Sequence, residues 1–154
     1  MKFDFLSKKK KSLYIEKASI LVEALPYIRE HSGKVVVIKY GGNAMINKEL
    51  AESFSRDIGL LKEVGINPII VHGGGPQISK ALKKKKINSE FIDGLRITNK
   101  KTIKVVKDVL FNDINLNIVN SITNTGGRCI GLSGHKQNLI EAKKISINKK
   151  KTWS

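Results

Sequence analysis

The chain has 154 residues, 40% hydrophobic and 27% charged, which is the ordinary range for a globular protein with one core. A single cysteine, Cys129, excludes a disulfide framework, and no Cys/His cluster has the spacing of a zinc site. No apolar stretch approaches the roughly 20 residues of a transmembrane helix, and the first apolar residues precede the charges, the wrong order for a signal peptide. We therefore expect a cytoplasmic protein with no metal site and no membrane partner.

The net charge is +16 and comes mostly from lysine tracts at residues 8–11, 83–86 and 149–151. Clustered cations favour a nucleic-acid partner because they release counterions from a phosphate backbone. Against that interpretation, aromatic residues make up only 6% of the chain and no nucleic-acid recognition motif is present. We interpret the tracts as solvated surface lysines and do not expect a nucleic-acid partner.

The amino-terminal residues predict a basic tail (1–12) followed by a helix (13–32). Pro26 lies within the helical segment, and we expect the helix to be kinked or to end near it because proline removes a backbone hydrogen bond. The apolar residues of this segment recur at helical spacing on one stripe. They are Leu13, Ile20, Leu21, Ala24, Leu25 and Ile28.

Two β-branched runs predict buried strands, KVVVIKY at 34–40 and INPIIVH at 66–72. Between them, apolar residues four positions apart predict a helix that ends at Gly65. A further helix is predicted from about Pro76, since proline suits the first turn of a helix. The stripe of the helix between the strands consists of Leu50, Phe54, Ile58 and Leu61.

The segment FIDGLRIT (91–98) predicts a short strand or one arm of a hairpin. A long helical pattern then begins with Thr98 or Asn99 as its N-cap and continues to the glycine pair that ends at Gly127. The apolar stripe of this pattern consists of Val106, Leu110, Ile114 and Ile118.

The last apolar runs, RCIGLSG (128–134) and NLIEAKKISI (138–147), predict strands. Strands that alternate with helices are typical of an α/β fold, with a mostly parallel sheet sandwiched by helices. We assign residues 33–148 to one lobe of this kind and residues 149–154 to a basic tail. No linker in the sequence would separate a further domain.

Two glycine-rich loops follow the two predicted strands: KYGG ends at Gly42 and HGGG ends at Gly75. A strand–helix–strand unit makes its strands parallel, so both loops lie at one edge of the sheet, where open α/β sheets bind ligands. Each loop leads into a helix, so free N–H groups and the positive end of a helix dipole favour an anion there. Lys39 adds a cation that can reach a phosphoryl oxygen. The alternative for either loop alone is a tight strand–helix turn.

Three further residues carry groups suited to binding or catalysis. Arg96 follows an Asp-Gly turn in an apolar segment, and its guanidinium can clamp a carboxylate; the alternative is an edge-strand arginine that reaches solvent. His72 has no second histidine or carboxylate in its motif, so we favour a structural role over that of a base or metal ligand. Cys129 is interpreted as a small buried hydrophobe rather than a nucleophile.

Four motifs in order, VVVIKYGGNAM, GINPIIVHGGGPQIS, FIDGLRIT and GGRCIGLSG, make the chain resemble the acetylglutamate kinases of the amino acid kinase family. The similarity runs from about Glu16 to Ile147. The resemblance implies phosphorylation of the side-chain carboxylate of N-acetyl-L-glutamate by ATP with Mg²⁺, the second step of arginine biosynthesis. It also implies a homo-oligomer formed through the sheet or through the N-terminal helix, which links dimers in the arginine-inhibited hexameric members.

The resemblance further implies roles for residues of the two loops. Lys39 would be the catalytic residue that stabilises the transferring phosphoryl group. The N–H groups that hold phosphate oxygens would belong to Gly41, Gly42 and Gly73. Gly74 and Gly75 would bind N-acetyl-L-glutamate through the main chain, and Arg96 would hold a substrate carboxylate. The nucleophile is a carboxylate that is already ionised at neutral pH, so this chemistry needs no general base.

The chain resembles the amino-terminal, substrate-binding half of a family member, and we expect the nucleotide-binding lobe to be absent. It departs from the family where Leu116 follows Asn115 in place of a lysine, and where His135 and Lys136 replace a Lys-Asp pair. We expect this chain alone to have little or no kinase activity. The alternative function is a non-catalytic module that binds acetylglutamate or pairs with full-length subunits.

Overall fold

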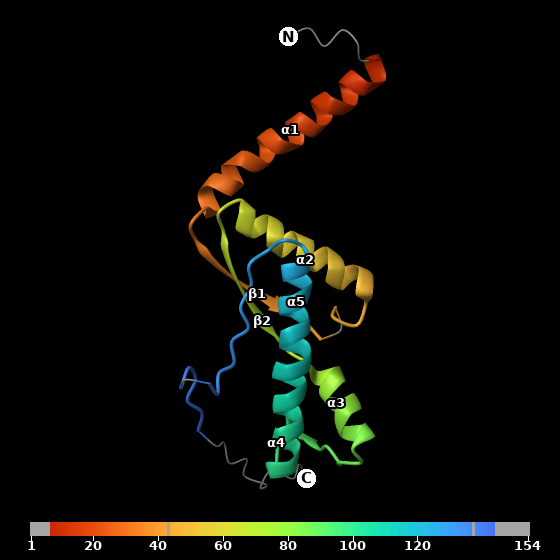
Figure 1. Ribbon diagram of the computed structural model, residues 1–154, viewed down its shortest axis with the longest axis vertical. Coiled ribbons are helices and arrows are strands. Elements are labelled where there is room, and N and C mark those ends of the chain that lie inside the picture. The colour runs from red at the N-terminus through yellow and green to blue at the C-terminus, as the bar shows by residue number, and fades with distance from the viewer. Residues whose placement is uncertain (1–6, 43, 137, 144–154) are drawn as a thin grey trace, which may run out of the picture.

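The computed structural model describes residues 7–42, 44–136 and 138–143; the predictions for residues 1–6 and 144–154 lie outside this part of the chain. The described residues form helices and a parallel strand pair (Figure 1), together with a small hairpin of two short strands. In chain order the elements are α1 (Lys8–His31), β1 (Val35–Tyr40), α2 (Lys48–Glu63), β2 (Asn67–His72), α3 (Gly75–Lys84), β3 (Phe91–Ile92), β4 (Leu95–Arg96), α4 (Lys100–Lys107), the π-helix η1 (Asp108–Asn115) and α5 (Leu116–Asn124).

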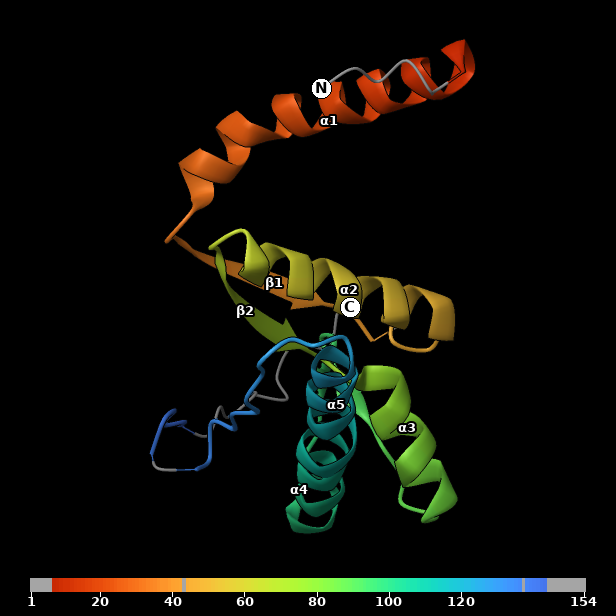
Figure 2. The same cartoon turned by 45° about the horizontal axis from the view of Figure 1, so that its top comes forward.

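Strands β1 and β2 pair in parallel, with Val35 opposite Asn67 and Tyr40 opposite His72. This pairing confirms the predicted α/β class with a parallel sheet. Helix α2 runs along one face of the pair (Figure 2), where the Tyr40 ring stacks on Phe54 with centroids 3.9 Å apart. Within the described chain the opposite face is apolar and exposed, so helices cover one side of the sheet there. The large apolar side chains exposed on these strands are Val35, Val37, Ile69 and Val71.

The hydrophobic core lies between α3 and the long helix formed by α4 and η1 (Figures 1 and 2). Leu82 of α3 is its most enclosed apolar member, with 1% of its surface exposed. The buried residues of this cluster are Ile78, Leu82, Val105, Val109 and Ile114. Burial of these side chains positions the amino end of α3, which follows the second glycine loop, against η1.

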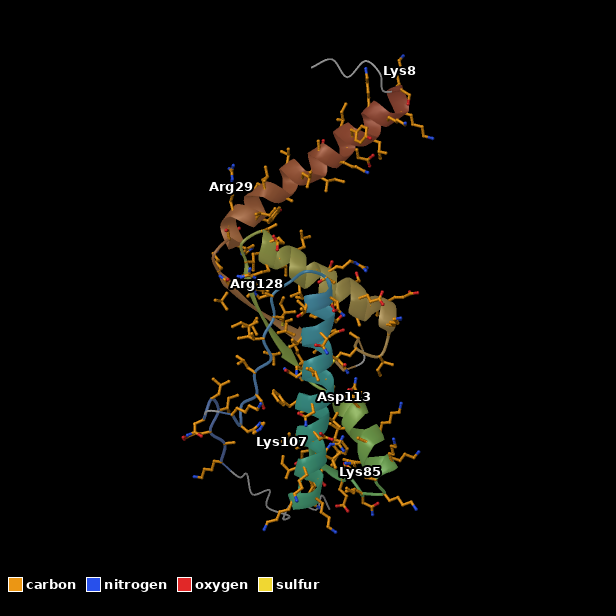
Figure 3. The ribbon with its side chains drawn as sticks, viewed as in Figure 1. Lys8, Arg29, Lys85, Lys107, Asp113 and Arg128 are labelled. Atoms are coloured by element: carbon orange, nitrogen blue, oxygen red, sulfur yellow. The ribbon has the colours of Figure 1, made fainter. Side chains whose placement is uncertain are left out.

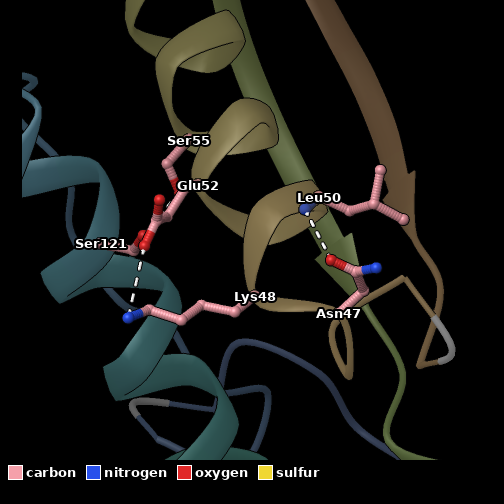
Figure 4. A network of polar contacts seen from close by, with 6 residues as sticks. All are labelled: Asn47, Lys48, Leu50, Glu52, Ser55 and Ser121. Carbon is pink, nitrogen blue, oxygen red and sulfur yellow. Dashed lines mark hydrogen bonds and ion pairs between the residues drawn. The ribbon is translucent and has the colours of Figure 1, made fainter.

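Local capping sets the helix boundaries that the sequence predicts. The Asn47 side chain accepts the Leu50 N–H at 3.1 Å at the start of α2 (Figure 4), and the helix ends before Gly65, whose φ is +89°. Asn99 caps α4 by accepting two N–H groups at 2.9 Å. These side chains satisfy backbone donors that lack a partner within the helix.

Helix α1 starts before its predicted first residue and ends close to its predicted last one. It begins at Lys8, within the segment expected to be a basic tail, because lysines are good helix formers and Ser7 caps the helix by accepting the Lys10 N–H at 3.4 Å. It continues past Pro26 to His31. None of its residues is buried, and the helix projects away from the sheet (Figures 1 and 2).

The predicted long helix is present from Lys100 to Asn124, but its middle section is a π-helix. Residues of η1 therefore have wider turns than the flanking α-helical segments. The segment 91–98, predicted as a short strand or one arm of a hairpin, contains both arms: β3 and β4 are antiparallel, and Asp93 and Gly94 between them both have positive φ. Such an Asp-Gly pair forms the tight turn that suits the twist of two antiparallel strands.

The segment after α5 contradicts the prediction of strands. Residues 128–136 and 138–143 contain no strand, and the rest of the second predicted strand lies outside the described chain. This segment makes hydrogen bonds within turns instead of pairing with a strand. For example, the Ile140 N–H donates to the Gly134 carbonyl at 2.9 Å. The physical reason is that an apolar run forms a strand only where a neighbouring strand accepts its hydrogen bonds.

All four lysines of the tract at residues 83–86 are exposed. Lys85, at the end of α3, and Lys107 of α4 both extend from the ribbon at the same end of the molecule (Figure 3). Among the described residues, no helix is both long and apolar enough to cross a membrane.

Candidate functional site

The two glycine loops lie side by side at the carboxyl edge of the strand pair. The Gly73 N–H donates to the Tyr40 carbonyl at 3.3 Å, and the Gln77 side-chain amide donates to the Gly42 carbonyl at 3.2 Å. A Cβ placed on Gly42 would stand 3.0 Å from Pro76 Cδ, so the first loop packs tightly on the start of α3. The sequence-based expectation that both loops occupy one edge therefore agrees with this geometry.

Gly74 is glycine because η1 packs directly against it. It is buried at the N-cap of α3, and an added Cβ would stand 2.5 Å from Ile114 Cδ1 and 2.8 Å from Leu110 Cδ2. By contrast, a Cβ on Gly73 or Gly75 would meet nothing within 4 Å. The middle glycine thus permits close packing, whereas its two neighbours leave open space at the amino end of α3.

The amino end of α3 is suited to an anion. The backbone N–H groups of a first helical turn have no partner within the helix, and the helix dipole is positive at this end. The first turn of α3 contains no acidic residue that would occupy these donors. Gly73 differs from its neighbours, because its N–H is already engaged by the Tyr40 carbonyl.

Arg96 of β4 reaches across to α3. Its Nη2 donates to Ser79 Oγ at 2.8 Å and approaches the Gly75 carbonyl at 3.5 Å, while Nη1 bonds Ser89 Oγ. Its guanidinium carbon also lies 4.5 Å from the centroid of the Phe91 ring. Within the described chain Arg96 has no carboxylate partner. A positively charged fork is therefore held beside the open amino end of α3.

Lys39 lies at the end of β1 on the face opposite α2. It is exposed, as are Val35 and Val37 on the same face, and its strand partner is Val71. The structure thus gathers the two glycine loops and Arg96 at one edge. It places Lys39 on the neighbouring exposed face of the same strand end.

His72 makes hydrogen bonds through both ring nitrogens. Its Nδ1 lies 3.0 Å from the Gly73 carbonyl oxygen, and its Nε2 lies 3.3 Å from Nδ2 of Asn115 at the end of η1. Sequence reasoning missed Asn115 as a partner, since it stands 43 residues along the chain from His72. It also missed the π-helical geometry that brings η1 against the loop.

A pocket of about 170 Å³ lies below the first glycine loop, on the α2 side of the sheet. Ser55 of α2 and Ser121 of α5, both labelled in Figure 4, line this pocket, and their hydroxyl oxygens lie 2.7 Å apart in a hydrogen bond that joins the two helices. Burial raises the pKa of Tyr40, which lines this pocket, above its ordinary value. The other lining residues are Met45, Ala51, Phe54, Gln77, Asp113, Ile114, Asn117 and Ile118.

The described part of the chain also contains residues of the types that bind metal ions, and one cysteine thiol. No three His, Cys, Asp or Glu residues there are grouped so as to hold a metal ion. Cys129 is half-buried, and burial raises the pKa of its thiol, which favours the unreactive protonated form.

Residues 34–153 match the amino acid kinase family, and the chain belongs to that family. Within the family, its similarity is to acetylglutamate kinases. It is 53% identical over 136 residues to the acetylglutamate kinase of Saccharophagus degradans, covering 88% of this chain and 45% of that protein. It is 56% identical over 133 residues to the acetylglutamate kinase of Syntrophobacter fumaroxidans, covering 86% of this chain and 45% of the relative.

The fold is also similar to that of N-acetylglutamate synthase from Neisseria gonorrhoeae, solved with coenzyme A and N-acetyl-glutamate. The TM-score is 0.61 at 20% identity, over 70% of this chain and 25% of that one. At that identity the likeness concerns the fold alone. The chain spans about half the length of the curated relatives it matches.

Proposed function

We propose that this chain supplies the acetylglutamate-binding lobe of a phosphotransferase that transfers the γ-phosphoryl group of ATP to N-acetyl-L-glutamate. The observation that carries the proposal is the position of Arg96, bonded to Ser79 and near the Gly75 carbonyl, beside the amino end of α3. A guanidinium has five N–H donors and binds carboxylates through a planar fork. Arg96 therefore retains donors for a substrate carboxylate.

The amino end of α3 supplies the second half of this binding site. N–H groups of Gly74 and Gly75 bind the substrate through the main chain, and the helix dipole favours its negative charge. The open space beside Gly73 and Gly75 leaves room for a small ligand. Close packing of Gly74 on η1 keeps the loop in place for binding.

The first loop and Lys39 act on the phosphoryl group. N–H groups of Gly41 and Gly42 hold phosphate oxygens, and the exposed Lys39 ammonium offsets the charge that develops on the transferring group. Gly73 contributes a phosphate contact only if its N–H leaves the Tyr40 carbonyl. Mg²⁺ arrives with the nucleotide, since this ion is commonly bound through substrate phosphates.

The share of the relatives that the chain covers limits the activity proposed for it. It spans 45% of the Saccharophagus degradans kinase, and its resemblance is to the half that binds substrate. We expect little acyl phosphate from this chain alone, and we place it with the cytoplasmic enzymes of amino-acid biosynthesis. Trapping the product as a hydroxamate measures this activity, and Lys39→Ala should abolish any product that forms.

A non-catalytic subunit-interaction module is the second candidate. Helix α1 has no buried residue and exposes several large apolar side chains, which a partner or a second copy would cover. Co-purification with a full-length kinase, lost when the helix is deleted, would favour this function. The exposed apolar residues of α1 are Leu13, Tyr14, Ile15, Ile20, Leu21, Val22, Leu25 and Tyr27.

Calorimetric titration with N-acetyl-L-glutamate tests the binding proposal. We expect the wild-type chain to bind this ligand and to bind free glutamate much more weakly. Arg96→Ala should remove the binding, whereas Arg56→Ala, which changes an exposed arginine of α2, should leave it intact. A folded wild-type chain that gives no heat, or an Arg96→Ala variant that binds as well as wild type, would contradict the proposal.

A further inference from the structure

A chain of two hydrogen bonds joins η1 to the second glycine loop. Nδ2 of Asn115 lies 3.3 Å from Nε2 of His72, and Nδ1 of His72 lies 3.0 Å from the Gly73 carbonyl oxygen. Among the described residues, no acidic or basic side chain is bonded to His72. Both ring nitrogens of His72 therefore have neutral partners.

The partners determine which ring nitrogen holds the proton. A carbonyl oxygen only accepts, so Nδ1 must carry the proton and donate it to Gly73. Nε2 then has a free lone pair, which accepts a hydrogen from the Asn115 amide. Asn115 thus stabilises one tautomer of neutral His72, the one that holds the Gly73 carbonyl.

The Gly73 carbonyl in turn fixes the direction of the Gly74 N–H. The two groups belong to one planar trans peptide and point in opposite directions. A peptide between two glycines rotates easily, because neither residue has a Cβ to restrict it. Holding the carbonyl oxygen of Gly73 on one side therefore presents the Gly74 N–H on the other.

The π-helix brings both supports to the loop. Ile114 packs against Gly74, and the next residue, Asn115, bonds His72. Gly131, from the segment after α5, lies so close that any side chain there would collide with Oδ1 of Asn115. The Asn115 amide is therefore confined between the loop and this segment, which restricts its orientation. Wide π turns occur frequently at functional sites.

We propose that Asn115 is a positioning residue for ligand binding. Through His72 it orients the Gly73–Gly74 peptide, so that the Gly74 N–H is presented to the bound carboxylate. This inference rests on the proposed function for its ligand. The arrangement of the peptide itself can be measured without any ligand.

The test compares Asn115→Leu with Asn112→Leu. Leucine is similar in size to asparagine but donates no hydrogen bond, and Asn112 is an exposed asparagine of η1 whose side chain donates to Asp108. Nitrogen NMR of His72 should show the proton on Nδ1 in wild type and in Asn112→Leu. In Asn115→Leu we expect a mixture of tautomers and a shifted Gly74 amide resonance. Affinity for N-acetyl-L-glutamate should fall about tenfold, the effect of losing one hydrogen bond.

Asn115→Asp gives a measurement that would not change if Asn115 served only to stabilise the fold. A carboxylate only accepts, so it bonds Nε2 when that nitrogen carries a proton. In neutral His72 the single ring proton is therefore drawn to Nε2, and Nδ1 no longer donates to the Gly73 carbonyl. Nitrogen NMR should show the proton on Nε2 in Asn115→Asp and on Nδ1 in wild type, and the Gly74 amide resonance should shift as well. Affinity for N-acetyl-L-glutamate should be lower in Asn115→Asp than in wild type, and a proton that stays on Nδ1 in this variant would contradict the inference.

The outcomes separate this inference from the proposed function. An unchanged His72 tautomer and Gly74 resonance in Asn115→Leu would overturn the inference, whatever the ligand does. If those signals change but wild type fails to bind acetylglutamate, the positioning stands and the proposed ligand is wrong. Equal ligand affinity in wild type and Asn115→Leu would also overturn the inference that Asn115 positions the loop.

Discussion

Arg96 Nη2 donates a 2.8 Å hydrogen bond to Ser79 Oγ and so ties the β3–β4 hairpin to the first turns of α3. A second serine, Ser89, bonds the other terminal nitrogen of the same guanidinium. These contacts hold the fork in one orientation beside the amino end of α3. The hairpin thereby contributes a positive charge to a site whose other donors belong to the backbone.

Arg96→Lys should weaken acetylglutamate binding although it preserves the charge. A lysine ammonium has no planar fork, so it cannot bond two serines and a carboxylate in the same geometry. We expect an affinity loss of at least about tenfold, in the range of a charged hydrogen bond. Calorimetric titration measures this loss of affinity. Ser79→Ala, which removes one serine partner of Arg96, should weaken binding less. An affinity for Arg96→Lys equal to that of wild type would show that charge alone matters.

Gly74→Ala should destabilise the fold, and Gly73→Ala should not. The new Cβ at position 74 would stand 2.5 Å from Ile114 Cδ1, whereas at position 73 it would meet nothing within 4 Å. Overpacking of this kind costs about 1–3 kcal/mol of unfolding free energy. Urea denaturation of the two variants measures the difference. Equal midpoints would mean that η1 does not pack on the loop as closely as the structure shows.

Thr102→Val should stabilise the protein. Thr102 is 0% exposed, and its hydroxyl has no hydrogen-bond partner among the described residues. Replacing a buried, unpaired hydroxyl by a methyl group of the same shape should raise the unfolding free energy by about 1 kcal/mol. Thr102→Ser keeps the hydroxyl, loses the methyl and should be destabilising. A less stable valine variant would show that the hydroxyl has a partner in solution.

Tyr40→Phe should alter how stability depends on alkaline pH. Burial raises the pKa of Tyr40 above its ordinary value of 10.0, so the unfolded chain loses this proton at lower pH than the folded one. The stabilisation is complete below the unfolded pKa and is lost as pH rises through the folded pKa. Unfolding free energies measured from below to above about pH 10 should fall less steeply in Tyr40→Phe. Tyr27→Phe, at a residue 67% exposed, should follow wild type.

Patterns local in sequence account for most of the fold. The β-branched runs before Gly41 and Gly73 form the predicted parallel strands, and Asn99 caps the long helix as expected. The hairpin follows from Asp93-Gly94, a pair that readily adopts positive φ. Each of these features is specified within a few residues, and for this reason the sequence alone predicts it.

Features that depend on distant contacts could not be predicted in the same way. The Asn115–His72 bond joins residues 43 positions apart, and a helical spacing of apolar residues does not distinguish π from α turns. The apolar run at 128–134 has strand-like composition, but no described residue pairs with it as a strand. Strand propensity expresses packing against a neighbour, so composition alone misassigned this segment.

The most direct test of the central claim is a proton–nitrogen NMR titration of the labelled chain with N-acetyl-L-glutamate. The account predicts that the amide resonances of Gly74 and Gly75 shift together with the Arg96 side-chain signal, and that free glutamate at the same concentration has little effect. Shifts confined to other parts of the chain, or an unchanged spectrum of a folded chain, would contradict the claim that this glycine loop binds acetylglutamate.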